Sequence, residues 1–181
     1  MDDRHMVVIP GRNFGPYSPL MFLPQLAARR RGAEVVPVSW HRDFDELGTG
    51  GIRAEEWVAD QVNPALAGLD RPLLVGKSLG SYASLIAANL DLPAVWITPL
   101  LHRPEIVAGL KRATAPFMLV GGTADPSWDG DVARGLTPRV CEIPGADHGL
   151  MRADRPLADY AAILSEVGTA VERFLDDVWT G

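Results

Sequence analysis

The sequence predicts an α/β fold with a mostly parallel, six-stranded sheet covered by helices on both faces. Short apolar runs alternate along the chain with longer segments of helical periodicity, which is typical of strand–helix–strand units. A chain of 181 residues with 47% hydrophobic residues can bury a substantial core without disulfides or metals. We therefore expect residues 1–181 to form a single domain.

Each expected element has its own local signal. The strands are the apolar runs at residues 6–9, 34–38, 72–75, 94–98, 117–120 and 140–143. The helices are expected at residues 20–31, 53–68, 79–90, 104–112, 129–136 and 157–178. The last is the clearest, because an apolar stripe at helical spacing follows Pro156 and indicates core packing. In the first two helices, Pro24 is expected in the opening turn and Pro64 is expected to cause a bend.

Composition and charge narrow the possible function classes. The chain has 17 basic and 23 acidic residues and a net charge of −6, which argues against nucleic acid as a partner. The first residues are polar without a signal-peptide pattern, and no apolar run is long enough for a membrane span. The single cysteine, Cys141, lies in an expected strand and excludes an intramolecular disulfide. We expect a cytoplasmic protein without membrane contacts, metal or cofactor.

One serine stands between two glycines directly after the third apolar run. Residues 76–80 read Gly-Lys-Ser-Leu-Gly, the G-x-S-x-G pattern of a nucleophile elbow. In this turn a buried strand bends sharply into a helix and holds the serine in a strained conformation, while the glycines allow close approach. The pattern predicts Ser78 as an exposed nucleophile at the start of a helix. Lys77 is interpreted as a side chain that flanks the elbow, not as a base.

Two later strands are expected to open into loops that carry an acid and a histidine. Asp125 follows the run 117–120 in Gly-Gly-Thr-Ala-Asp, and His148 follows the run 140–143 in Gly-Ala-Asp-His-Gly. The chain order is therefore Ser, Asp, His, each at the carboxyl end of an expected strand. On these motifs the chain resembles serine hydrolases of the α/β-hydrolase fold superfamily over nearly its whole length.

The chemistry of these three side chains explains why they occur together. A serine hydroxyl is a weak nucleophile at neutral pH, so His148 is expected to take its proton and later return it to the leaving group. Asp125 is expected to fix the imidazole tautomer and to stabilise the imidazolium. Asp129 and Asp147 are alternatives for the acid, although a helix cap suits Asp129 better and a turn suits Asp147 better.

The resemblance also implies an oxyanion hole made of two backbone N–H groups. Leu79, the residue after the nucleophile, supplies one of them by position. The second is expected from the loop after the first strand, where Pro10-Gly11 stands in place of the His-Gly that is frequent in the family. Arg12 is the expected donor, with Asn13 as the neighbouring alternative.

The resemblance implies a shortened member of the superfamily. Two strands that usually precede the oxyanion loop are absent, and residues 99–103 lead directly to the next helix where the family often inserts a lid. We therefore expect an open site without a cap domain. The expected substrate-binding residues lie just past strand ends, where α/β sheets collect ligands. They are Asn13, Phe14, Trp40, Leu100 and Trp128, with Leu101 and Leu150 similarly placed.

The expected function is hydrolysis of a small carboxylic ester or thioester through an acyl-enzyme on Ser78. An apolar acyl or aromatic group is the expected guest. Two alternatives stand beside it. One is an acyltransferase or peptidase on the same triad, and the other is a binding or scaffold protein that keeps the fold with little or no catalysis.

Overall fold

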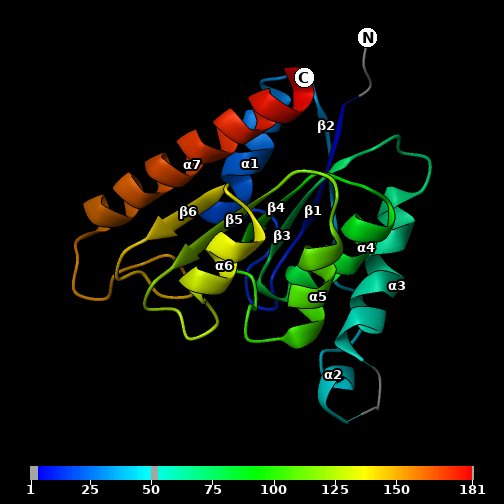
Figure 1. Ribbon diagram of the computed structural model, residues 1–181, viewed down its shortest axis with the longest axis horizontal. Helices are drawn as coiled ribbons and strands as arrows, with labels where there is room; N and C mark the ends of the chain where they lie inside the picture. Colours follow the sequence, from blue (N-terminus) through cyan, green and yellow to red (C-terminus); the bar gives the residue numbers. More distant parts are fainter. Residues whose placement is uncertain (1–3, 50–52, 181) are drawn as a thin grey trace.

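Six parallel strands form one sheet at the centre of the molecule (Figure 1). The computed structural model describes residues 4–49 and 53–180. The strand order is β2-β1-β3-β4-β5-β6, and every neighbouring pair is parallel. The strands are β1 (His5–Ile9), β2 (Glu34–Pro37), β3 (Leu73–Lys77), β4 (Ala94–Ile97), β5 (Phe117–Gly122) and β6 (Val140–Ile143). The predicted six-stranded parallel sheet is therefore confirmed.

Helices cover both faces of this sheet, as predicted (Figure 1). The helices are α1 (Pro19–Arg29), α2 (Glu46–Thr49), α3 (Ala54–Leu66), α4 (Ser84–Asn89), α5 (Pro104–Arg112), α6 (Gly130–Leu136) and α7 (Leu157–Thr180). One face packs against α1 and α7, and the other packs against α3, α4, α5 and α6. Successive residues of β1 serve opposite faces, so Met6 and Val8 join the first core while Val7 and Ile9 join the second.

Three local expectations were wrong. The helix expected over residues 79–90 begins as a 3₁₀ turn, η1 (Ser78–Ala83), before α4, because the Ser81 hydroxyl donates to the carbonyl of Ser78 and tightens the turn. Pro24 lies in the interior of α1, since the helix begins earlier, with Pro19 in its first turn. The short helix α2 was not expected at all.

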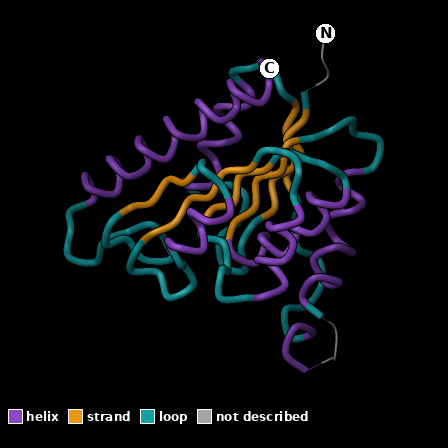
Figure 2. Tube along the Cα trace, in the orientation of Figure 1, coloured by secondary structure: helices purple, strands orange, loops and turns teal. Residues whose placement is uncertain are grey.

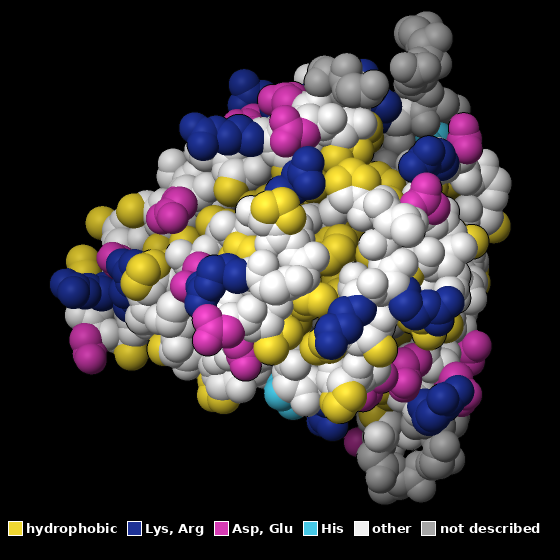
Figure 3. Space-filling model, viewed as in Figure 1, with side chains coloured by type: hydrophobic (Ala, Val, Ile, Leu, Met, Phe, Trp, Pro, Cys, Tyr) yellow, Lys and Arg dark blue, Asp and Glu magenta, His cyan; other side chains and the backbone are white. Residues whose placement is uncertain are grey.

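The loops that follow the strands gather along one edge of the sheet (Figure 2), because the carboxyl ends of parallel strands share that edge. Residues 98–103 alone connect β4 to α5, so no cap domain is inserted at this position. In the described parts of the chain, no helix has the length and hydrophobicity of a membrane span. On the face shown in Figure 3, basic and acidic side chains are interspersed.

Candidate active site

A sharp turn at the end of β3 presents Ser78. Its φ angle is +50°, a left-handed conformation that costs a non-glycine residue about 1–3 kcal/mol. Neither glycine of the motif leaves room for a side chain. A Cβ on Gly76 would lie 2.5 Å from the Trp96 ring, and one on Gly80 would lie 2.4 Å from the Ile9 carbonyl oxygen. The expected elbow geometry is therefore present, with Ser78 partly exposed.

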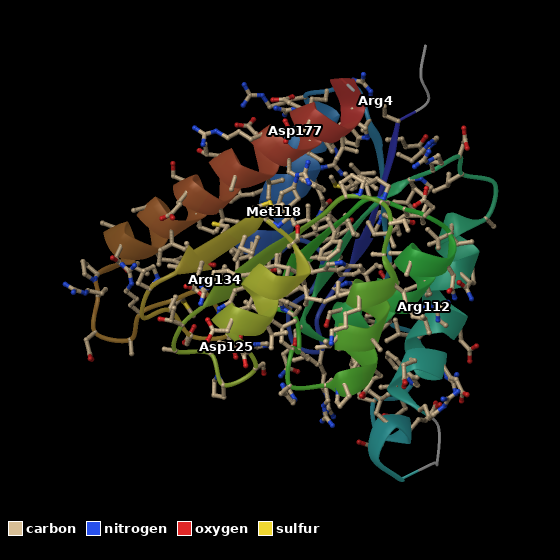
Figure 4. The ribbon with its side chains drawn as sticks, in the orientation of Figure 1. Arg4, Arg112, Met118, Asp125, Arg134 and Asp177 are labelled. Atoms are coloured by element: carbon tan, nitrogen blue, oxygen red, sulfur yellow. The ribbon has the colours of Figure 1, made fainter. Side chains whose placement is uncertain are left out.

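His148 lies between Ser78 and Asp125. Its Nε2 is 2.8 Å from the Ser78 Oγ, and its Nδ1 is 2.7 Å from the Asp125 Oδ2. Figure 4 shows Asp125 on the loop after β5, at the opposite end of the sheet from Arg4, which precedes β1. Three residues separated widely in sequence thus meet at the carboxyl edge of the sheet in the order that the sequence predicts.

The environment of Asp125 favours its ionised form. Burial of this fully enclosed carboxyl acts to raise its pKa. The hydrogen bonds from His148 and from the Ser127 N–H, together with the positive charge of Lys77, outweigh burial and hold the pKa below its ordinary value. An ionised carboxylate only accepts hydrogen bonds, so Nδ1 of His148 carries a proton and Nε2 is free to accept from Ser78.

The two alternative acids have local roles. Asp129 caps α6 by accepting a hydrogen bond from the Val132 N–H at 2.9 Å. Asp147 accepts from the N–H groups of Gly149 and Met151, at 2.8 and 3.0 Å, and so closes the turn that carries His148. Neither carboxylate reaches the imidazole among the contacts of the described residues, which leaves Asp125 as the acid beside His148.

The loop after β1 runs close to Ser78. A Cβ on Gly11 would lie 3.4 Å from the Lys77 carbonyl oxygen and 3.5 Å from the Ser78 Cβ, so the loop backbone passes directly beside the elbow. Among the backbone hydrogen bonds of the described residues outside regular helices and strands, none is donated by the N–H group of Leu79 or Arg12. Both remain predictions as oxyanion donors.

Of the five expected substrate-binding residues, Leu100 alone lines the cleft that contains Ser78. Asn13 lies exposed on the loop after β1, and Phe14 packs with its ring centroid 4.3 Å from the Lys77 Nζ. The two tryptophans, Trp40 and Trp128, do not line this cleft, and each makes contacts with the rest of the protein. Trp40 donates its indole N–H to the Gly11 carbonyl at 3.2 Å and packs against Trp57.

The ring of Trp128 covers Gly121, where a Cβ would lie 2.0 Å from it, and its indole N–H donates to Glu142 at 2.7 Å. Trp128 therefore packs over β5 and β6 and is not among the residues that line the cleft. Leu101 and Leu150 are likewise buried in the protein interior. Of the apolar residues past strand ends, Leu100 therefore lines the cleft, whereas Trp40, Trp128, Leu101 and Leu150 pack against other parts of the protein.

The cleft beside Ser78 has a volume of about 550 Å³. Its lining joins the elbow to the segment between β2 and α3, and consists of Arg12, Phe44, Asp45, Leu47, Ala54, Ser78, Leu79, Tyr82, Leu100 and Arg103. The sequence interpretation missed the wall formed by Phe44, Leu47 and Tyr82. The first two follow the carboxyl end of β2, a position that signals a site residue, whereas Tyr82 lies in the turn that continues from the elbow. No group of three or more His, Cys, Asp or Glu residues in the described chain fits a metal ion.

Comparison with known proteins identifies the fold. Est1E from Butyrivibrio proteoclasticus superimposes with a TM-score of 0.76 at 13% identity, covering 99% of this chain and 89% of that one. A serine hydrolase without a lid from Xanthomonas campestris, XC6422, gives 0.66 at 20% identity, covering 94% and 82%. The chain has the α/β-hydrolase fold. Dienelactone hydrolase from Anabaena variabilis gives 0.67 at 18% identity, covering 97% and 87%. At the level of sequence, no family model and no curated protein matches.

Proposed function

We propose that this α/β-hydrolase-fold chain is a serine hydrolase of carboxylic esters or thioesters. The observation that carries the proposal is the position of His148, with one ring nitrogen 2.8 Å from the Ser78 Oγ and the other 2.7 Å from the Asp125 carboxylate. This is the arrangement in which a histidine can activate a serine while a buried acid fixes the histidine's tautomer. The solved structures of similar fold, which include serine hydrolases and a dienelactone hydrolase, support the same reaction class.

The proposed reaction has two halves. In the first, the Ser78 Oγ attacks the substrate carbonyl carbon while the Nε2 of His148 accepts the hydroxyl proton. The negative oxygen of the tetrahedral intermediate is stabilised by the N–H groups of Leu79 and Arg12. The intermediate collapses, and the leaving alcohol or thiol takes the proton from His148. In the second half, His148 takes a proton from a water that attacks the acyl carbon of the acyl-enzyme; the bond from that carbon to the Ser78 Oγ then breaks, the carboxylic acid leaves, and His148 returns the proton to Ser78.

The cleft supports an apolar acyl group as the part of the substrate that is held. Phe44, Leu47 and Leu100 supply apolar surface on the walls beside Ser78. Est1E has also been solved with ferulic acid bound, at a TM-score of 0.73 and 14% identity to this chain. We therefore propose a short aliphatic or an aromatic acyl ester as the substrate class.

Turnover of activated esters tests the proposal. The purified chain is expected to hydrolyse p-nitrophenyl acetate and butyrate, with weak preference between them because no lid is inserted between β4 and α5. Ser78→Ala and His148→Ala are each expected to lower kcat by roughly a thousandfold or more, because triad members act as one unit. His102→Ala, a substitution at an exposed histidine, is the matched control and is expected to leave turnover unchanged.

Two outcomes would count against the proposal. If Ser78→Ala keeps most of the activity, the serine is not the nucleophile. If the parent chain turns over neither esters nor thioesters and transfers no acyl group to an added alcohol or amine, the binding or scaffold alternative is favoured. Transfer in preference to hydrolysis would instead identify an acyltransferase.

A further inference from the structure

The residue before the nucleophile is a lysine whose side chain has no exposed surface. Lys77 ends β3 and is among the largest fully buried side chains of the described chain. A buried ammonium group is costly unless its protons are bonded, so lysine is rarely found in such a position. The elbow pattern does not explain this choice, because the motif accepts any residue between the first glycine and the serine.

Each proton of the ammonium group faces a partner on a different loop. Nζ donates to the Thr98 Oγ1 at 2.8 Å and to the carbonyl oxygen of His148 at 3.0 Å. It also lies 4.3 Å from the ring centroid of Phe14, a cation–π distance. Lys77 therefore joins the loops that follow β1, β4 and β6. In the described residues, no carboxylate lies within ion-pair distance of it.

Lys77 donates a hydrogen bond to His148, the residue whose imidazole lies between the side chains of Ser78 and Asp125. The imidazole is held by those two side chains, while the main chain of the same residue is held by Lys77. Because Lys77 and Ser78 are adjacent on a rigid elbow, the nucleophile and the clamp on the histidine are fixed by one piece of backbone.

We propose that Lys77 is a positioning residue, which clamps the His148 backbone through its ammonium group and so keeps the imidazole aligned with Ser78 and Asp125. The inference rests on the proposed function for its kinetic consequence, although the alignment itself is a structural property. It assigns no proton transfer to Lys77, since the ammonium group donates to a carbonyl and a hydroxyl and Lys77 is not among the residues that line the cleft.

The charge of the clamp depends on pH. Burial lowers the pKa of Lys77 from 10.5 to about 8, with Asp125 and Asp147 acting in the opposite direction. Asp125 and Asp147 lie on the loops after β5 and β6. The other groups that face the Lys77 ammonium group are the His148 carbonyl, the Thr98 hydroxyl and the Phe14 ring. Above the pKa the amine is neutral and its hydrogen bond to the His148 carbonyl weakens.

The kinetic test compares Lys77→Met with Lys111→Met, which changes the chain's only other lysine, an exposed residue of α5. For p-nitrophenyl acetate we expect Lys77→Met to lower kcat by about 10²-fold with little change in KM, because a misaligned base slows the chemical step and Lys77 does not line the cleft. The parent kcat is expected to fall above about pH 8, and this fall is expected to be absent in Lys77→Met. Lys111→Met is expected to match the parent throughout.

A second readout does not depend on activity. The proton on Nδ1 of His148, bonded to Asp125, is expected to give a far-downfield NMR resonance in the parent. It is expected to broaden or disappear in Lys77→Met, and in the parent as pH rises above about 8, while the protein stays folded by circular dichroism. The pH titration of the parent covers the case in which Lys77→Met fails to fold.

The outcomes separate this inference from the proposed function. A parent that shows the resonance but turns over neither esters nor thioesters contradicts the proposed function and leaves the alignment role standing. A Lys77→Met protein with parental kcat, parental pH profile and an intact resonance overturns the inference, even if the chain is a hydrolase.

Discussion

The buried lysine makes the stability of the protein depend on pH in a way that can be calculated. In the folded chain Lys77 has a pKa of about 8, mainly because burial disfavours the ammonium form, against 10.5 for a solvated lysine. Between these two pH values the unfolded chain binds the proton and the folded chain does not. The free energy of unfolding therefore rises with pH across this window.

The size of the effect follows from the same two values. The interval between 10.5 and about 8 corresponds to about 3 kcal/mol, which is the cost of keeping the charged lysine buried at neutral pH. Lys77→Met has no titrating group at this position, so its unfolding free energy lacks this pH-dependent cost. The difference in unfolding free energy between Lys77→Met and the parent is therefore expected to move by about 3 kcal/mol, toward the parent, between pH 7 and 10.5.

Urea unfolding followed by tryptophan fluorescence at several pH values measures this difference. Tyr82, Tyr160 and Cys141 also titrate at alkaline pH, each with a pKa raised chiefly by burial, but they are common to both proteins and cancel in the difference. Lys111→Met is the control and is expected to give a constant difference. Parallel curves for Lys77→Met and the parent would refute the buried-charge account.

Three further substitutions test the geometry of the elbow and its neighbours. Ser78→Gly relieves the strained φ of +50° and is expected to raise the unfolding free energy by about 1 kcal/mol while abolishing turnover; lower stability would argue against strain. Gly80→Ala places a Cβ 2.4 Å from the Ile9 carbonyl oxygen of β1 and is expected to lower the free energy of unfolding in urea by about 2 kcal/mol or more. Gly135→Ala, whose Cβ would have no atom within 4 Å, is the control and is expected to leave that free energy unchanged or to raise it. Trp40→Phe removes the bond to the oxyanion loop and is expected to lower kcat about fivefold at constant KM; an unchanged kcat would show that the loop is held without it.

The sheet and the meeting of Ser78, Asp125 and His148 at one edge of it were predictable because each strand and each loop has a short-range signal. Strands of a parallel sheet are buried on both faces, so β1, β3 and β5 appear in the sequence as continuous apolar runs. Ser78, Asp125 and His148 each follow such a run in a glycine-containing loop, and parallel topology brings those loops to one edge.

The remaining features depend on tertiary contacts that no local pattern encodes. Trp40 and Trp128 follow strand ends, a position that is typical of ligand-binding residues. In the structure the indole N–H of Trp40 donates to the Gly11 carbonyl, and that of Trp128 donates to the Glu142 carboxylate. The cleft wall at Phe44 and Leu47 comes from the segment between β2 and α3, whose path depends on packing against Trp57. The contacts of Lys77 were missed because its partners are the main-chain carbonyl of His148 and the hydroxyl of Thr98. Neither group forms a sequence pattern that indicates a contact with Lys77.

The central claim is that Ser78 is a nucleophile activated by His148, and covalent labelling tests it most directly. The purified parent is treated with a fluorophosphonate probe, and the modified residue is located by mass spectrometry of its peptides. We predict one adduct, on Ser78, that is absent in Ser78→Ala and forms far more slowly in His148→Ala. Labelling of Ser78→Ala at the parental rate, or an adduct on another serine of the parent, would contradict the account.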